Sequence, residues 1–331
     1  MKSSIFSAIA TVLAIAVLIA LGESICRILN AQKNAQKPPS AVTSYSFLER
    51  DPELGTRVST GTHVGVTRRK GSQIIYSVNY SVDNKHRRET PQTGKRNRLV
   101  LFFADSLAFG EGVNDNETLP YFFASFSRSA RVYNYGTPGH GPQQLLARLE
   151  EGKLGEEVSG DLPSLIYIWI DAHINRAIGD MRQASSGSNY PYYELSSEDQ
   201  LVRKGTFSNG RPLLSSLYKR LNRSSIVRFF GLNFPKIGTR HVKFAARILK
   251  ASAVLFNQQF KSDRFYVLLY PGCLLCQPLK QELESSLIKV LDYSKLFERG
   301  RKGLIIEGDG HPSPQAYKEI AFRLAEDLKN K

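Results

Sequence analysis

Cysteine is scarce in this chain, which carries three cysteines among its 331 residues. Cys273 and Cys276 form a C-x-x-C motif, but no further cysteine or nearby histidine completes a four-ligand zinc site. A thioredoxin-like redox role requires a matching βαβ context, which the sequence does not establish. The pair therefore predicts either a local disulfide or two plain loop thiols. Cys26 is not preceded by the small residue that lipoprotein processing requires.

Phosphate-binding and nucleic-acid motifs are absent as well. There is no G-x-x-x-x-G-K-[ST] sequence, and Gly139-x-Gly141 lacks the third glycine of a dinucleotide fingerprint. The formal net charge is nevertheless +15, and nine Lys or Arg face two acids between Val66 and Arg98. Such charge without a nucleic-acid motif favours a solvated basic face or a membrane-surface role. We expect no nucleic-acid partner, no metal and no cofactor.

Charge is missing altogether from residues 3–22, a run of 20 residues. At ~1.5 Å per residue such a helix spans about 30 Å, the thickness of the hydrocarbon core of a bilayer. The run is longer than the usual apolar region of a signal peptide, about 7–15 residues, which favours an uncleaved anchor in contact with membrane lipid. A cleaved signal peptide is the alternative, since Ala20 and Gly22 place small residues where a peptidase reads. Either case predicts a single-pass or exported protein with a periplasmic or extracellular domain.

The rest of the chain divides by composition. After the anchor at 1–22 we expect a polar stalk at 23–45, a β-rich lead-in at 46–97 and an α/β domain at 98–331, with a Ser-, Asn-, Gly- and Tyr-rich insertion at 175–236. Apolar runs of strand length occur at 99–103, 131–135, 165–170, 265–270 and 304–306. Helical periodicity occurs at 117–126, 142–151, 242–260, 279–293 and 314–328. Strands that alternate with helices predict a doubly wound domain with a mostly parallel sheet.

Two short segments carry residues suited to nucleophilic catalysis. Ser106 follows the apolar strand 99–103, so it lies at the carboxyl end of that strand, where functional loops gather. Asp309 and His311 precede the last helix on one loop. His311 supplies a base and Asp309 an orienting carboxylate, which is what a serine nucleophile requires. Each segment taken alone has a structural interpretation, because Asp105-Ser106 and Ser313-Pro314 also have the sequence of helix starts.

A third segment, 132–142, runs from a strand through a glycine-rich turn into a helix. Gly136 lets a backbone N–H approach a developing oxyanion closely. Together the three segments resemble the SGNH/GDSL hydrolase family over roughly residues 45–330. This resemblance implies a three-layer α/β/α fold and ester hydrolysis through an acyl-serine without a metal. In it Ser106 is the nucleophile, His311 the base and then the acid, and Asp309 the orienting carboxylate. The N–H groups of Ser106 and Gly136 contribute to the oxyanion hole.

The chain departs from the family pattern in two places. Ala104 replaces the usual glycine before the Asp-Ser pair, which is a mild change. The fourth motif, normally Gly-x-Asn-Asp, lacks its asparagine, and Asp171 cannot donate in its place when ionised. His173 is either a substitute oxyanion donor or a structural histidine. Losing one such donor lowers kcat by ~10²–10³.

We therefore expect a membrane-tethered esterase that acts on an acylated small molecule or an O-acylated cell-envelope glycan. Tyr190, Tyr192 and Tyr193, with the basic lead-in, either line a cleft for an extended anionic substrate or pack internally. The alternative is a catalytically weakened glycan-binding or acyl-transfer accessory protein on the same fold.

Overall fold

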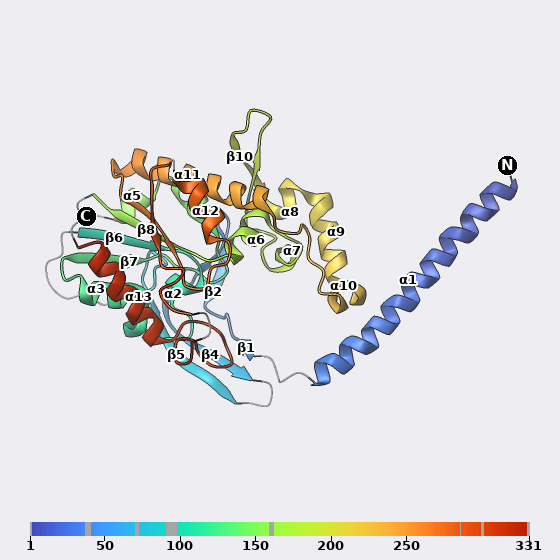
Figure 1. The fold of residues 1–331 in the computed structure, drawn as a ribbon, viewed down its shortest axis with the longest axis horizontal. Coiled ribbons are helices and arrows are strands. Elements are labelled where there is room, and N and C mark those ends of the chain that lie inside the picture. Colours follow the sequence, from blue (N-terminus) through green and yellow to red (C-terminus); the bar gives the residue numbers. More distant parts are fainter. Residues whose placement is uncertain are drawn as a thin grey trace.

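The centre of the molecule is a five-stranded parallel sheet (Figure 1). The computed structural model describes residues 2–36, 41–69, 73–90, 98–158, 162–284, 286–298 and 301–329. From edge to edge the sheet is formed by β12 (Ile288–Asp292), β11 (Phe265–Leu269), β8 (Ser164–Trp169), β6 (Arg98–Phe103) and β7 (Ala130–Asn134). Because β6 lies inside the sheet, the loop that follows it is flanked by the loops after β7 and β8.

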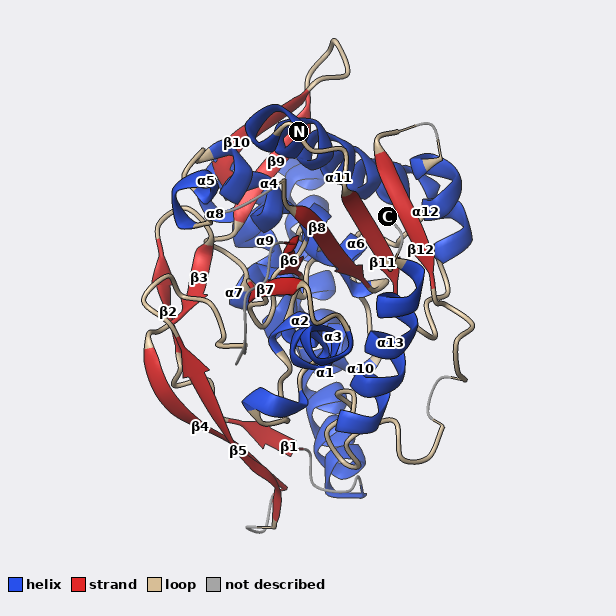
Figure 2. Cartoon of the chain, turned by 90° about the vertical axis from the view of Figure 1, so that its left-hand side faces the viewer, coloured by secondary structure: helices blue, strands red, loops and turns tan. Residues whose placement is uncertain are grey.

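Helices cover both faces of this sheet, as Figure 2 shows. The β6 residues Leu99, Leu101 and Phe103 pack on one face, whereas Val100 and Phe102 pack on the other. The first face is covered by α4 (Pro142–Glu150), α6 (Ala172–Ile178), α11 (Thr239–Phe260) and α12 (Cys276–Leu283). The second is covered by α2 (Ser106–Phe109), α3 (Leu119–Phe126) and α13 (Pro314–Asp327). The predicted three-layer α/β/α fold is therefore confirmed.

One strand and one helix differ from the prediction. The helix expected at 279–293 ends at Leu283, and the next residues form the edge strand β12. The strand expected at 304–306 is instead part of a loop, held by a single bridge between Ile305 and Pro312. Three apolar residues cannot distinguish a strand from a loop whose leucine is buried. The other four predicted strands, β6, β7, β8 and β11, and the other predicted helices lie within a few residues of expectation.

The lead-in forms a small β-structure under α2. Strands β1 (Ala41–Thr43), β4 (Gly61–Arg69) and β5 (Ile74–Val82) make one antiparallel sheet, and β2 (Leu48–Asp51) pairs with β3 (Gly55–Val58). Its core includes Phe47 and Tyr80, which both contact Phe109 at the end of α2. The lead-in therefore supports the helix that begins with Ser106. A 3₁₀ turn (Asp115–Glu117) links α2 to α3, and α5 (Leu154–Glu157) precedes β8.

Two arginines of the lead-in serve internal roles, whereas Arg68 and Lys85 are exposed. Arg88 is buried and binds Asp115 together with backbone carbonyls, including that of Val113. Arg87 pairs with Asp83 and lies over the ring of Tyr133. Arg87 and Arg88 therefore contribute little to an exposed basic face. Lys70, Lys95 and Arg96 lie outside the described residues.

The insertion builds a compact unit between α6 and α11. It contains α7 (Gln183–Ser186), the hairpin of β9 (Pro191–Leu195) and β10 (Leu201–Thr206), α8 (Phe207–Gly210), α9 (Pro212–Arg223) and α10 (Ser225–Phe229). Tyr190, Tyr192 and Tyr193 are buried in apolar clusters. Of the two interpretations offered for these tyrosines, internal packing is correct.

The chain begins with one long helix, α1 (Lys2–Gln36). Its stretch from Ile5 to Ala35 is long and apolar enough to cross a membrane. The helix continues through the first part of the expected stalk at 23–45, so a polar composition there did not end it. Residues 37–40 of that stalk lie outside the described residues.

Candidate active site

The structure brings Ser106, His311 and Asp309 together at the carboxyl end of β6. The Nε2 atom of His311 lies 2.9 Å from the hydroxyl oxygen of Ser106, and its Nδ1 atom lies 2.5 Å from a carboxylate oxygen of Asp309. The imidazole thus bridges the serine and the carboxylate, which is the order that proton transfer from the serine requires. The three residues come from two loops about 200 positions apart in the sequence.

The loop from Leu304 to Ser313 fixes the Asp–His geometry. The carbonyl of His311 accepts a hydrogen bond from the amide of Ile306 at 2.7 Å, and the amide of Ser313 donates to the carbonyl of Leu304 at 3.1 Å. Gly310 has a φ of +97°, a conformation that a side chain would strain. Ser313 caps α13, so the loop ends on a rigid helix. Both functional side chains therefore belong to one pinned turn.

Ser106 is presented by the short helix α2. The carboxylate of Asp105 caps that helix by accepting a hydrogen bond from the amide of Leu107 at 3.0 Å. Ser106 occupies the first helical position, where its own N–H has no acceptor within the helix. The helix ends at Gly110, whose φ of +81° is left-handed. Both helix-start interpretations of these segments thus hold alongside the catalytic one.

Gly136 packs closely against α2, and its N–H has a partner within the protein. Its N–H donates a hydrogen bond of 2.9 Å to the side chain of Asn134, so it is not directed at Ser106. A Cβ atom at Gly136 would lie 2.1 Å from the amide nitrogen of Phe109. The role of Gly136 as an oxyanion donor stays a prediction, and in this structure its N–H is paired with Asn134. Asn134 itself also donates to the carbonyl of Ala108 at 2.8 Å and so ties β7 to α2.

His173 also has partners within the protein. It is fully buried, with Nδ1 3.1 Å from the hydroxyl of Tyr167 and Nε2 3.4 Å from the carboxylate of Asp105. Burial lowers the pKa of His173. Asn175, the first asparagine after β8, donates a hydrogen bond of 2.6 Å to the carboxylate of Asp180. This burial and these contacts favour the structural interpretation of His173.

Asp105 is held ionised by a partner that the sequence did not reveal. Arg176 lies 2.5 Å from its carboxylate and also donates to the carbonyl of His140 at 2.8 Å. Burial alone would raise the pKa of Asp105, but Arg176 and then His173 hold it well below the usual range. The arginine takes this position three residues after His173 on α6, because residues three apart share a helix face. Only the tertiary packing of α6 against β6 identifies the pair.

Glu111 is a second carboxyl group beside His311. Its side chain is 1% exposed, and one oxygen lies 3.6 Å from Nε2 of His311, the nitrogen that faces Ser106. Among the described residues, neither oxygen meets a hydrogen-bond donor at normal geometry. Burial raises the pKa of Glu111. For His311, burial opposes the charged form, but the Asp309 hydrogen bond and the Glu111 charge raise its pKa overall. Glu111 was missed because it lies between two glycines that read as a turn.

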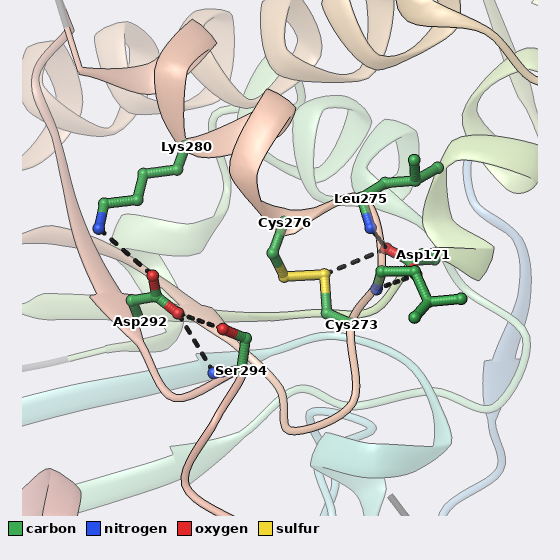
Figure 3. The surroundings of a disulfide bond; sticks show 8 residues. Asp171, Cys273, Leu275, Cys276, Lys280, Asp292 and Ser294 are labelled. Carbon is green, nitrogen blue, oxygen red and sulfur yellow. Dashed lines mark hydrogen bonds and ion pairs between the residues drawn. A yellow bond between two sulfur atoms is a disulfide. The ribbon is translucent and has the colours of Figure 1, made fainter.

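A pocket opens beside the triad. Its wall includes Leu107 and Pro312, each next to a triad residue, and the disulfide residue Cys273. Asp171 at the end of β8 accepts hydrogen bonds from the amides of Leu274 and Leu275 at 2.6 and 3.1 Å (Figure 3). Of the two states left open for the C-x-x-C pair, the disulfide is the one present. Asp171 and the disulfide together fix the loop that forms this wall.

A second pocket lies where the lead-in meets α4. It contains Ala104 and Thr137, from the loops after β6 and β7, together with the cations Arg57, Lys85 and Arg148. Gln144 also lines it, and the side-chain nitrogen of this buried residue meets no acceptor in the described part of the chain. Burial lowers the pKa of the neighbouring His140 to about 4, so its ring is uncharged near neutral pH.

Comparison with known proteins gives structural similarity without sequence similarity. No protein-family model and no curated protein matches the chain. A G-D-S-L family lipolytic protein from Veillonella parvula aligns at 13% identity over 71% of this chain and 100% of its own, with a TM-score of 0.42. An acetyl xylan esterase from Butyrivibrio proteoclasticus aligns at 11% identity over 74% and 66%, with a TM-score of 0.39. Similarity this distant carries no argument about activity, which rests on the geometry above.

Proposed function

We propose that this chain is a membrane-tethered SGNH/GDSL-type serine esterase. The observation that carries the proposal is the pair of contacts made by His311, 2.9 Å to Ser106 and 2.5 Å to Asp309. Both are within the range for a working nucleophile, base and orienting carboxylate. The residues lie at the carboxyl ends of parallel strands, where doubly wound folds carry their sites.

The chemistry follows from the positions of these atoms. Nε2 of His311 accepts the proton of Ser106 as the hydroxyl oxygen attacks the ester carbonyl. Asp309 stabilises the imidazolium that forms, and the same Nε2 then protonates the departing alcohol. Water activated by His311 releases the acyl group from Ser106. Every proton in this scheme passes through one ring nitrogen, so its environment controls the rate.

The oxyanion hole is the weakest part of the site. The N–H of Ser106 is unpaired by helix geometry, whereas Gly136 and His173 have other partners. With fewer donors than a complete hole, turnover is expected to be reduced by ~10²–10³ unless substrate binding supplies another donor. This feature favours the second candidate, an acyl-transfer or glycan-binding accessory protein on the same fold.

For the substrate we propose an O-acylated, anionic cell-envelope glycan. The pocket beside the triad has an apolar wall suited to an acyl group, formed by Leu107, Ile170, Tyr270, Phe297, Leu304 and Ile305. In the second pocket Arg57 and Arg148 already pair with carboxylates, so Lys85 is the cation we propose for an acidic group on the ligand. The export predicted for the domain gives access to the envelope.

A fluorophosphonate probe tests the enzyme directly. The full chain in detergent is expected to label at Ser106 and to hydrolyse simple acetyl esters, whereas Ser106→Ala and His311→Ala lower kcat by about 10⁶-fold. Ser125→Ala, an exposed serine on α3, serves as the control and retains labelling. Absence of labelling in the wild-type chain contradicts the esterase. If the chain labels but does not hydrolyse esters, and turnover appears when a second alcohol is supplied, acyl transfer is favoured instead.

A further inference from the structure

The second part of the insertion and the helix α11 that follows it form a long acid-free basic segment. From residue 201 to residue 262 the chain contains thirteen Lys or Arg and no Asp or Glu. This segment therefore accounts for most of the formal net charge of +15. Among the described residues, its exposed cations Arg220, Arg223 and Lys236 take part in no ion pair. Arg203, Lys243 and Arg247 pair with acids elsewhere in the chain, so the segment is only partly neutralised within the molecule. Its remaining exposed cations attract an anionic surface.

Large apolar side chains project from the same part of the insertion. Leu213 and Leu217 lie one turn apart on α9 and are 87% and 50% exposed, while Phe230 just after α10 is 64% exposed. Ser215 and Tyr218 on the opposite side of α9 are buried. Helix α9 thus packs one face against the domain and exposes apolar side chains on the other. Exposed apolar groups among cations are typical of helices that lie in a membrane interface.

The position of α10 relative to α1 identifies what lies nearby. The carboxylate of Glu23 accepts a hydrogen bond of 2.6 Å from the amide of Ser225, and Asn30 donates one of 2.9 Å to the carbonyl of Ser225. Figures 1 and 2 both place α10 beside α1. Glu23 is the first charged residue after the apolar run that ends at Gly22. The start of α10 is therefore level with the point where α1 would leave a bilayer.

A groove between α1 and α10 adds charge at that level. It is lined by Arg27 and Lys33 from α1 and by Arg228 from α10, together with Asn30 and Ser225. Its lining contains no acidic residue among those described. Two cations on α1 beyond its uncharged run, with Arg228 of α10 beside them, match the phosphate layer of an anionic leaflet, at ~1 kcal/mol each.

We propose that the α9–α10 surface, defined as the exposed side of residues 212–236, is a second membrane contact that rests on an anionic lipid bilayer beside α1. The apolar side chains enter the interface while the cations bind headgroup phosphates. The bilayer is favoured over a protein partner because a membrane-spanning helix lies alongside and because the surface is basic throughout. This proposal requires α1 to be retained as an anchor, and it is independent of the triad.

Fluorescence quenching in proteoliposomes tests the contact. The full chain, with Cys26→Ser as background, carries a single NBD-labelled cysteine at Leu213→Cys or Leu217→Cys and is reconstituted in vesicles of phosphatidylcholine and phosphatidylglycerol at a 3:1 ratio. Leu287→Cys is the matched control, because Leu287 is 49% exposed and precedes β12 at the far edge of the sheet. Lipid-attached nitroxide is expected to quench positions 213 and 217 several-fold more strongly than position 287, and aqueous iodide is expected to do the reverse.

The charge contribution is tested in the same system. We expect lipid quenching at position 213 to fall under each of three changes, while quenching at position 287 stays the same. The changes are replacement of phosphatidylglycerol with phosphatidylcholine, addition of 0.5 M salt, and the double substitution Arg220→Gln with Arg223→Gln. Equal iodide accessibility at 213, 217 and 287 in anionic vesicles overturns the proposal. Protection of 213 and 217 from both quenchers also overturns it, since another protein or a second copy then covers the surface.

Discussion

Two histidine–carboxylate pairs flank the carboxyl end of β6, and they differ in every property that matters for catalysis. The outer pair, His311 and Asp309, contacts Ser106, and the His311 side chain is 21% exposed. The inner pair, His173 and Asp105, is fully buried. Asp309 and Glu111 raise the pKa of His311 against the effect of burial, whereas burial lowers the pKa of His173. Asp105 and Ser106 are neighbours in sequence but serve different pairs.

The difference shows that an Asp–His contact does not by itself make a base. The outer imidazole faces two carboxyl groups and a hydroxyl, so it is able to gain a proton. The inner imidazole shares its carboxylate with Arg176, which already supplies the positive charge. A second cation there would be repelled, so His173 stays neutral and structural.

Among the variants that test the difference between the two pairs, Asp309→Asn is expected to have the largest effect. The asparagine retains the shape of the loop but holds His311 in the wrong tautomer, so kcat for ester hydrolysis is expected to fall by about 10⁴-fold. Steady-state kinetics on an acetyl ester measure the loss. Glu307→Gln, which neutralises an exposed acid on the same loop, is the control and leaves kcat unchanged. A fall below tenfold for Asp309→Asn contradicts the role given to the outer pair.

Arg176→Met is expected to act on stability. It leaves the Asp105 carboxylate buried without its cation, which costs about 3–5 kcal/mol. Because the folded-state pKa of Asp105 is depressed, the stabilisation is present above the ordinary carboxyl pKa and is lost as pH falls toward the folded pKa. Thermal unfolding at several pH values measures both effects.

The control for this variant is Arg247→Met, since Arg247 pairs with Asp199 at the surface and such pairs contribute about 0–1 kcal/mol. Equal losses of stability in Arg176→Met and Arg247→Met would falsify the assignment of the inner pair as a buried ionic group.

His173→Phe separates the two functions proposed for this residue. If His173 is structural, kcat changes less than about tenfold while the melting temperature falls, because Tyr167 and Asp105 each lose a partner. An oxyanion donor would instead lower kcat by ~10²–10³ in a protein that still folds. Kinetics and thermal unfolding of the same preparation distinguish these results.

Glu111→Gln is expected to give the smallest change, a shift in the pH profile. Hydrolysis requires neutral His311, so kcat/KM rises as pH increases through the pKa of His311. Loss of the Glu111 charge lowers that pKa, and the acid limb of the profile therefore moves to lower pH. His311, Tyr45, Asp309 and Asp105 are the other ionisable groups that act on Glu111. An acid limb that stays in place, as expected for Glu307→Gln, argues against the contact.

Much of this arrangement could be predicted because it is local in sequence. Ser106 follows an apolar strand directly, and Asp309 and His311 share one loop, so their order along the chain indicated a common site. The inner pair could not be found in the same way. Asp105 follows β6, whereas His173 and the partner Arg176 lie on α6, and only packing places these residues together. The fifth strand was misplaced for a similar reason, since 304–306 has the composition of a strand but is shaped by its contacts with 311–313.

The pinned turn from Leu304 to Ser313 has a consequence for how the site would fail. The base and its carboxylate are held by hydrogen bonds within one short segment, so changes elsewhere in the protein leave their mutual geometry intact. Only the distance from His311 to Ser106 depends on how α13 and α2 sit on the sheet. Damage to the scaffold would therefore uncouple the nucleophile from an otherwise complete dyad. Conversely, residues 304–313 hold the Asp–His geometry by themselves. Grafting this segment before a helix of another protein would therefore transfer the dyad geometry.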